Sequence, residues 1–121
     1  MPNNFYNILV PVDFSARSKW AIAKAIELAN TFKCNIHLVH VAPTSVLPVS
    51  DGDAGTLAYN ISAEMEFAAK KLRQLRDQYF HHVCNGGKIE ISVLYGQPKA
   101  ALKNYIEQYQ IDKTIGVQRI S

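Results

Sequence analysis

The order of apolar and polar positions predicts strands and helices that alternate along the chain. An unbroken apolar run at residues 8–12 is typical of a strand covered on both faces, so we place it at the centre of a sheet. A second apolar run at residues 36–41 predicts another strand. Between the two, after Asp13 or Ser15 as the helix cap, apolar residues recur at steps of three and four and predict an amphipathic helix. The predicted apolar positions of this helix are Trp20, Ala21, Ala25, Leu28, Ala29 and Phe32.

The second half of the chain continues this alternation. Residues 42–56 are rich in Pro, Gly, Ser and Asp and predict a loop of about fifteen residues, which is long for such a connection and therefore a candidate for function. Residues 57–79 carry apolar side chains at helical spacing and predict a long amphipathic helix. Period-two alternation over residues 89–95 predicts an edge strand with one wet face. Pro98 marks the first turn of a last helix, and residues 112–117 predict a short fourth strand.

Alternating strands and helices predict an α/β fold, in which a parallel twisted sheet carries helices on both faces. Ligands of such sheets bind beyond the carboxyl ends of the strands, at the point where the strand order reverses. This rule places the candidate site at Asp13, after the first strand, and at Val41 and Ala42, at the end of the second.

Length, composition and charge limit the classes of function. A chain of 121 residues with 48% hydrophobic and 19% charged residues is expected to form one domain over residues 1–121. A net charge of +3, spread along the chain, argues against a nucleic-acid partner, and no apolar stretch has the length of a membrane span. Cys34 and Cys84 stand alone, which predicts reduced thiols. Without a secretion signal, we expect a cytoplasmic protein.

Several segments resemble the universal stress protein family in order and spacing, over nearly the whole chain. They are residues 8–13 followed by Ser15, Ser18 and an Ala-rich helix, residues 38–41, the tripeptide at residues 96–98, and Asp112 before the fourth strand. The resemblance implies a Rossmann-like fold of the adenine nucleotide alpha hydrolase-like kind, with strand order 3-2-1-4-5. For this chain we expect four strands in the order 3-2-1-4.

The resemblance also implies a nucleotide pocket. In family members that bind ATP, the residues that match Pro11, Val12 and Asp13 line the adenine and ribose pocket. The residue that matches Val41 contacts adenine through its backbone. These four residues are therefore the predicted cofactor-binding residues, with ATP as the candidate cofactor.

The chain departs from the family pattern where the phosphates of ATP would bind. Family members carry a glycine-rich loop after the fourth strand, but its first two glycines fall at Val117 and Ile120 here, with Gly116 one residue early. β-Branched residues resist the positive φ angles that such loops use. We therefore expect a domain that is incomplete at its C-terminus and lacks the loop and the fifth strand.

Individual candidate residues have simpler alternatives. Asp13 suits a ribose hydroxyl but also suits a helix cap or turn. His40 suits acid–base chemistry, but a buried or half-buried strand histidine explains it without a catalytic partner. His37 and His40 are expected on opposite faces of their strand, so they do not share a metal. The cluster His81-His82-x-Cys84 offers at most three ligands near the end of a helix, which does not predict a metal site.

These observations lead to a principal hypothesis and an alternative. The first is a non-enzymatic domain that resembles universal stress proteins, acts through dimerisation or partner binding, and binds ATP weakly or not at all. Its fourth strand would be an exposed sheet edge that pairs with another copy. The alternative is an ATP-binding module that senses or slowly hydrolyses nucleotide, with Asp13 and Val41 retained for that purpose. No nucleophile motif or P-loop appears, so no catalytic residue is predicted.

Overall fold

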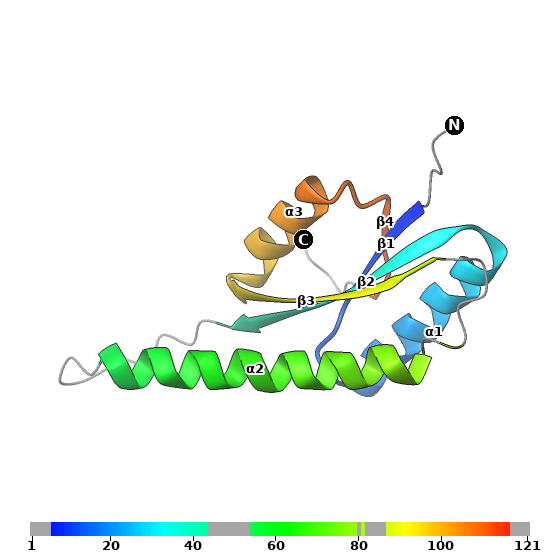
Figure 1. Cartoon of the computed structure of the whole chain (residues 1–121). Coiled ribbons are helices and arrows are strands. Elements are labelled where there is room, and N and C mark those ends of the chain that lie inside the picture. The colour runs from blue at the N-terminus through cyan, green and yellow to red at the C-terminus, as the bar shows by residue number, and fades with distance from the viewer. Residues whose placement is uncertain (1–5, 44–53, 80, 82–86, 117–121) are drawn as a thin grey trace.

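A computed structural model of the chain describes residues 6–43, 54–79, 81 and 87–116. Its described part holds four strands, β1 (Tyr6–Pro11), β2 (Cys34–Pro43), β3 (Ile89–Gly96) and β4 (Lys113–Thr114). The helices are α1 (Ala16–Thr31), α2 (Ala54–Tyr79) and α3 (Pro98–Gln108). The strands form one sheet in the order β3-β2-β1-β4, and every neighbouring pair is parallel (Figure 1). The predicted α/β fold and strand order 3-2-1-4 are confirmed.

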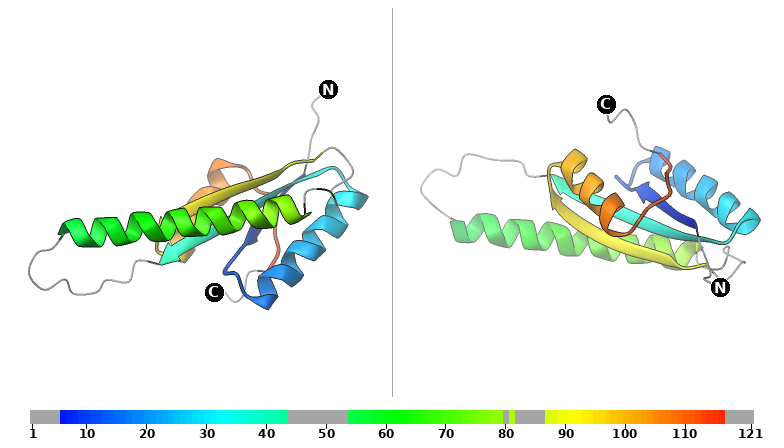
Figure 2. Two further views of the ribbon diagram at one scale, coloured as in Figure 1. Left: turned by 60° about the horizontal axis from the view of Figure 1, so that its bottom comes forward. Right: turned by 90° about the horizontal axis from the view of Figure 1, so that it is seen from above.

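The helices cover both faces of the sheet. Helices α1 and α2 lie on one face and α3 lies on the other, as Figure 2 shows from two further directions. The larger core cluster joins α1 and α2 to the sheet through residues such as Ile22, Ile26 and Leu72. The smaller cluster beneath α3 contains Leu102 and Tyr105. The helix α3 therefore packs against the sheet in a cluster of its own, smaller than the one that α1 and α2 share.

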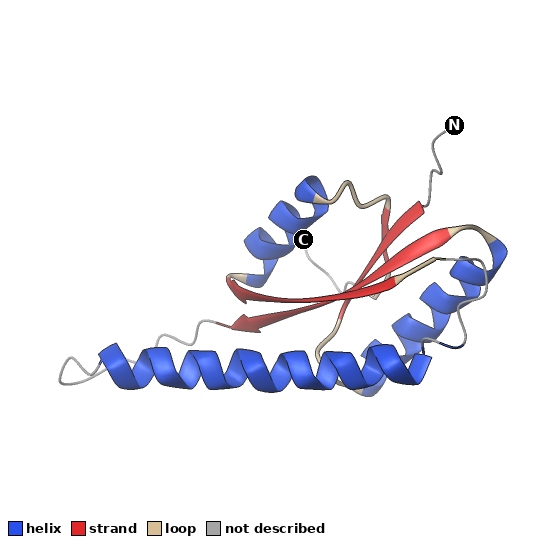
Figure 3. Ribbon diagram, in the orientation of Figure 1, coloured by secondary structure: helices blue, strands red, loops and turns tan. Residues whose placement is uncertain are grey.

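Strand β1 owes its central place to its apolar run. Ile8, Leu9 and Val10 are fully buried, because successive side chains point to the two covered faces of the sheet. Both flanking strands run parallel to β1, with Ile8 opposite Ile36 of β2 and Lys113 of β4. The carboxyl ends of β1 and β2 consequently meet at one edge (Figure 3).

The apolar face predicted for α1 needs correction. Trp20 and Phe32 are each 59% exposed, whereas Ser18, Ile22 and Ile26 are buried together with the alanines. The buried positions define a face that points away from Trp20, and Phe32 follows the last helical turn as the C-cap. Both aromatic residues fit a spacing of three or four, but this spacing does not show which side of the helix is buried, and α1 packs against the sheet through small and β-branched side chains.

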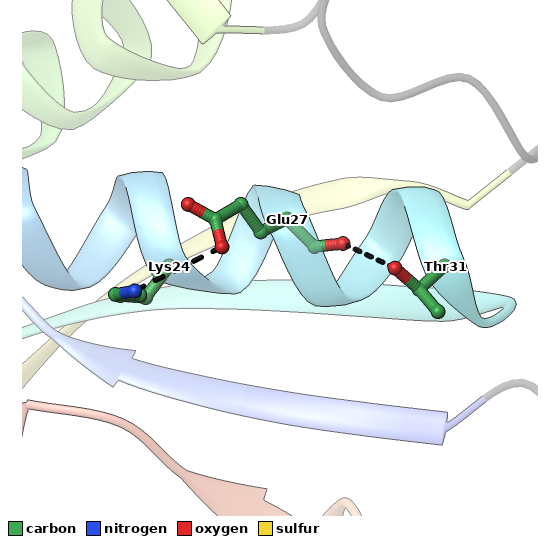
Figure 4. Close-up of polar contacts among 3 residues, drawn as sticks. All are labelled: Lys24, Glu27 and Thr31. Carbon is green, nitrogen blue, oxygen red and sulfur yellow. Dashed lines mark hydrogen bonds and ion pairs between the residues drawn. The ribbon is translucent and has the colours of Figure 1, made fainter.

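The outward side of α1 carries exposed polar contacts instead of a core face. The Lys24 ammonium lies 3.8 Å from the Glu27 carboxylate, and the Thr31 hydroxyl donates to the Glu27 carbonyl oxygen at 3.1 Å (Figure 4). The side chains of this ion pair are 47% and 72% exposed. Such surface pairs contribute about 0.2–0.5 kcal/mol to a helix. This side of α1 therefore adds little to the stability of the fold.

All predicted strands and helices are present, but several of their boundaries differ from the prediction. Helix α2 begins at Ala54, earlier than the predicted start at residue 57, and β2 extends to Pro43, so the intervening loop is shorter than predicted. Within the described residues, β4 spans only Lys113–Thr114, shorter than the predicted residues 112–117. The strand β3 lies at a sheet edge, as predicted. No helix in the described part of the chain is both long and apolar enough to cross a bilayer.

Candidate functional site

A cavity of about 280 Å³ opens where β1 and β2 end. The four predicted site residues, Pro11, Val12, Asp13 and Val41, all line it. The structure thus brings them together from two strands, although their contact with a ligand stays a prediction. The described lining residues are Pro11, Val12, Asp13, Arg17, Ser18, Val39, His40, Val41, Pro98, Leu102 and Gly116.

Asp13 is held in place by the start of α1. Its carboxylate oxygen Oδ1 accepts hydrogen bonds from the Ser15 hydroxyl at 2.5 Å, the Ser18 hydroxyl at 2.6 Å and the Ser15 backbone N–H at 3.0 Å. The Asp13 backbone N–H in turn donates to Ser18 Oγ at 2.9 Å. These bonds orient the carboxylate before any ligand arrives.

Hydrogen bonding also fixes the charge of Asp13. Donation from the Ser15 side chain, followed by donation from Ser18, lowers the pKa of this carboxyl group to about 2. Asp13 is therefore an anion and a hydrogen-bond acceptor at neutral pH. The donors from Ser15 and Ser18 all reach Oδ1.

The sequence left the helix cap open between Asp13 and Ser15, and in the structure the two residues have separate roles. Ser15 is the N-cap of α1, with an extended backbone and a side-chain oxygen that accepts from the Ser18 N–H. Asp13 closes the turn that precedes it. The turn reading of Asp13 is confirmed, and its contact with a ligand stays a prediction.

The turn between β1 and α1 is held from two sides. Phe14 has a φ of 63°, a left-handed conformation that a residue with a Cβ seldom adopts. Its ring packs 4.9 Å from the ring of His40, and the Lys71 ammonium lies 5.1 Å from its centre. The His40 Nδ1–H donates to the Val12 carbonyl oxygen at 2.7 Å. Contacts from β2 and α2 therefore support the backbone that presents Asp13.

The two strand histidines occupy different surroundings. His40 is half-buried and lines the cavity, as the strand-histidine reading predicted. His37 is 4% exposed and lies beneath α3, where it contacts Tyr105. They contribute to opposite faces of the sheet, as predicted, and cannot share a metal. Among the described residues, no group of three or more His, Cys, Asp or Glu side chains could hold a metal ion, and Cys84 lies outside those residues.

Seven of the eleven described cavity residues were not predicted as site residues from the sequence, and four of these seven lie on helices. Arg17 and Ser18 come from the first turn of α1, and Pro98 and Leu102 come from α3. The sequence did hold a signal for Ser18 at the site, since a hydroxyl five residues after a strand-end aspartate can reach back to the carboxylate. The sequence held no signal for the contribution of α3, because helical spacing does not show which end of a helix contacts a distant strand.

Gly116 completes the cavity from the β4 side. Its φ is +89°, and a Cβ added there would lie 2.7 Å from Ala21 Cβ. Only glycine lets the backbone after β4 approach α1 this closely. Val117 and Ile120, the positions of the family glycines, lie outside the described residues.

Comparison with known proteins identifies the family. The sequence pattern of the universal stress protein family matches residues 4–115. The chain belongs to the universal stress protein family. A comparison with curated protein sequences returns no match.

Solved structures agree with this assignment. The universal stress protein UspA from Lactobacillus plantarum is 27% identical, with a TM-score of 0.76 over 92% of this chain and 75% of that one. A universal stress protein family member from Burkholderia pseudomallei is 16% identical, with a TM-score of 0.72 over 94% of this chain and 82% of that one. A universal stress protein solved in complex with cAMP is 17% identical, with a TM-score of 0.58 over 91% of this chain and 70% of that one. The latter two show the fold alone.

Proposed function

We propose that this universal stress protein is a non-enzymatic domain that binds the nucleoside part of an adenine nucleotide weakly in the strand-end cavity. It works by pairing with a second copy or another partner. The observation that carries the binding proposal is the cavity itself, which places the ionised Asp13 and the end of β2 around one space. A carboxylate held by two serines offers a fixed acceptor for the paired hydroxyls of a ribose.

The size of the cavity supports weak rather than tight binding. At about 280 Å³, it lies below the range of about 300–1,000 Å³ in which sites bury most of a ligand. A nucleoside would therefore keep much of its surface in water. We expect a dissociation constant of about 1 mM, which corresponds to about 4 kcal/mol.

The choice of ligand class has independent support. One structurally similar universal stress protein was solved in complex with cAMP, which makes adenine nucleotides the first ligands to test. The apolar side chains of Val12, Val41 and Leu102 offer a surface for a planar base.

One observation favours the alternative, an ATP-binding module that senses or slowly hydrolyses nucleotide. Arg17 lines the cavity together with Asp13, and an arginine guanidinium can bind a phosphate through two donors. If this contact dominates, phosphates rather than the nucleoside will determine affinity.

Isothermal titration with adenosine and with Mg-ATP tests the proposal and separates it from the alternative. We expect the two affinities to agree within a few fold, both near millimolar. Replacement of Asp13 by Asn should weaken adenosine binding, because a neutral amide is a poorer acceptor for two hydroxyls. Replacement of Thr31 by Ala, on the outer side of α1, is the matched control and should change nothing. Micromolar ATP binding with much weaker adenosine binding would contradict the proposal and support the alternative.

Pairing at the sheet edge is the second half of the proposal. Within the described residues, β4 has a strand neighbour only in β1 and spans two residues, Lys113 and Thr114. An edge strand presents N–H and C=O groups that can pair with another chain. We propose that a second copy binds at β4.

A further inference from the structure

His37, which lies beneath α3, is buried within a chain of hydrogen bonds whose donors and acceptors can be assigned. His37 is 4% exposed, with Nδ1 2.8 Å from the Tyr105 hydroxyl and Nε2 3.4 Å from Asn7 Oδ1. Asn7 Oδ1 also accepts from the Asn35 amide at 3.4 Å, and a carbonyl oxygen can only accept. Nε2 therefore carries the proton of the neutral ring, and Nδ1 accepts from the Tyr105 O–H.

Protonation of His37 conflicts with this arrangement. The Ser92 hydroxyl donates to Tyr105 Oη at 3.4 Å, and Tyr105 in turn donates to His37. A proton on Nδ1 would make His37 a donor toward the hydroxyl that now donates to it. The Tyr105 O–H would then have to turn away from His37 and lose this acceptor, and the new charge would lie in a buried site.

The groups that surround His37 only partly offset this cost. Strand β3 places Glu90 opposite His37 in the register, which favours the charged ring. Helix α3 contributes the rings of Tyr105 and Tyr109, at 5.6 and 5.8 Å from the His37 ring, and β1 contributes the neutral amide of Asn7. Burial outweighs Glu90, so the pKa of His37 is lowered from its usual value.

The partner of His37 is also a main attachment of α3. Leu102 and Tyr105 are the buried residues of α3, and Tyr105 supplies the hydrogen bond to His37. The same helix brings Pro98 and Leu102 to the lining of the strand-end cavity. Any change that loosens Tyr105 from the sheet therefore acts on one wall of that cavity.

We propose that His37 is a pH-responsive positioning residue, whose neutral form holds α3 against the sheet through Tyr105 and whose protonation loosens α3 and the cavity wall that it carries. The docking of α3 is independent of any ligand. Only the expected effect on affinity rests on the proposed function.

The direction of the pH effect follows from the lowered pKa. The unfolded or undocked state takes up a proton at a pKa of about 6.5, whereas the docked state takes it up only at a lower pH. The stabilisation of docked α3 is therefore complete above about pH 6.5 and is lost as the pH falls toward the pKa of the docked state. Mild acid should open α3 before the rest of the fold.

Amide hydrogen exchange on the complete, ligand-free chain tests this directly. Protection factors, corrected for the intrinsic pH dependence of exchange, are compared for α3 and α1 at pH 7.5 and pH 5.5. We expect the protection of α3 relative to α1 to fall with decreasing pH, by at most about tenfold per pH unit below 6.5. Equal changes in both helices, or no change in α3, would overturn the proposal.

Two variants separate titration of His37 from simple loss of packing. The variant His37→Asn keeps an acceptor near the position of Nδ1 but cannot titrate, so its α3 should stay protected at pH 5.5. The variant Tyr105→Phe removes the donor that favours the neutral ring, so its α3 should open at a higher pH than in the parent. The exposed His81 gives the control His81→Gln, which should behave like the parent. If His37→Asn does not fold, the shift in Tyr105→Phe decides: an unchanged or lowered opening pH overturns the proposal.

The two proposals can fail separately. Adenosine affinity should fall in parallel with α3 protection in the parent and remain constant in His37→Asn. If adenosine does not bind at any pH, the proposed function fails, and the exchange data still decide the role of His37. If adenosine binds and the protection of α3 does not depend on pH, the role of His37 fails alone.

Discussion

At the scale of single residues, two serines in the first turn of α1 determine what Asp13 can do. Ser15 caps the helix and donates to the carboxylate, and Ser18 gives and receives one hydrogen bond with Asp13. Ser18 is buried, although serine is usually exposed, because both of its bonding directions are occupied. The local sequence therefore builds an oriented anion at the end of β1.

Replacement of Ser15 by Ala tests this arrangement. The N-cap and the strongest donor to Asp13 are lost together, so the free energy of unfolding should fall by about 1 kcal/mol in urea denaturation. The pKa of Asp13, followed by NMR of its carboxyl carbon, should rise from about 2 toward 3.8. Since the Asp13 pKa is lowered in the folded state, its stabilisation is complete above about pH 3.8 and is lost as the pH falls toward 2.

Thr31 offers a matched control at the other end of the same helix. Its hydroxyl bonds to the exposed Glu27 carbonyl oxygen, so Thr31→Ala should change the free energy of unfolding by no more than about 0.5 kcal/mol (Figure 4). If the two alanine variants are equally stable, or if the Asp13 pKa does not move in Ser15→Ala, Ser15 does not have the assigned role.

Residue roles were predictable from the sequence where they depend on near neighbours. The turn at Asp13, the cap at Ser15 and the strand position of His40 all follow from a few adjacent residues. The burial of His37 was not predictable, because its partner Tyr105 lies 68 positions further along the chain. Trp20 was assigned to the core because its spacing fits, yet spacing alone does not show which side of a helix meets the sheet.

At the scale of elements, the two edges of the described sheet differ. Strand β3 spans eight residues and β4 spans two. The order of these strands could be predicted because alternating strands and helices permit few arrangements, and the family resemblance selected one of them. The length of β4 could not be predicted, since the residues that pair with β1, Lys113 and Thr114, are not distinguished by an apolar pattern from those that follow.

The two edges provide a test of pairing between copies. If a second copy binds at β4, amide protection of Lys113, Thr114 and their neighbours should rise with protein concentration, together with the mass measured by light scattering. Protection along β3 serves as the internal control and should stay constant. A monomeric mass at high concentration, or protection that rises along β3 instead, would contradict pairing at β4.

At the scale of the whole molecule, the strand-end cavity is lined by residues from both faces of the described sheet. Strands β1 and β2 supply Asp13 and Val41, α1 supplies Arg17 and α3 supplies Leu102. Gly116 closes the β4 side by its approach to α1. The sequence located the cavity through the rule for parallel sheets, whereas its size and its α3 wall depend on long-range packing.

A second hollow, between α1 and α2, is an alternative place for a ligand to bind in the same molecule. It is lined by Phe14, Lys71, Gln74 and Gln78, among others, and its volume is about 260 Å³. The Lys71 ammonium there lies 4.8 Å from the centre of the Phe67 ring and 5.1 Å from the centre of the Phe14 ring. Ser18 lines both hollows, whereas Lys71, Gln74 and Gln78 of α2 line only this one, so their amides report a ligand that binds here.

Titration of the ¹⁵N-labelled chain with adenosine, followed by two-dimensional NMR, tests the central claim most directly. We predict that the amide signals of Asp13, Val41 and Gly116 shift together and saturate with a dissociation constant of about 1 mM. Shifts confined to the amides of Lys71, Gln74 and Gln78, or no shifts at several millimolar adenosine, would contradict binding at the ends of β1 and β2.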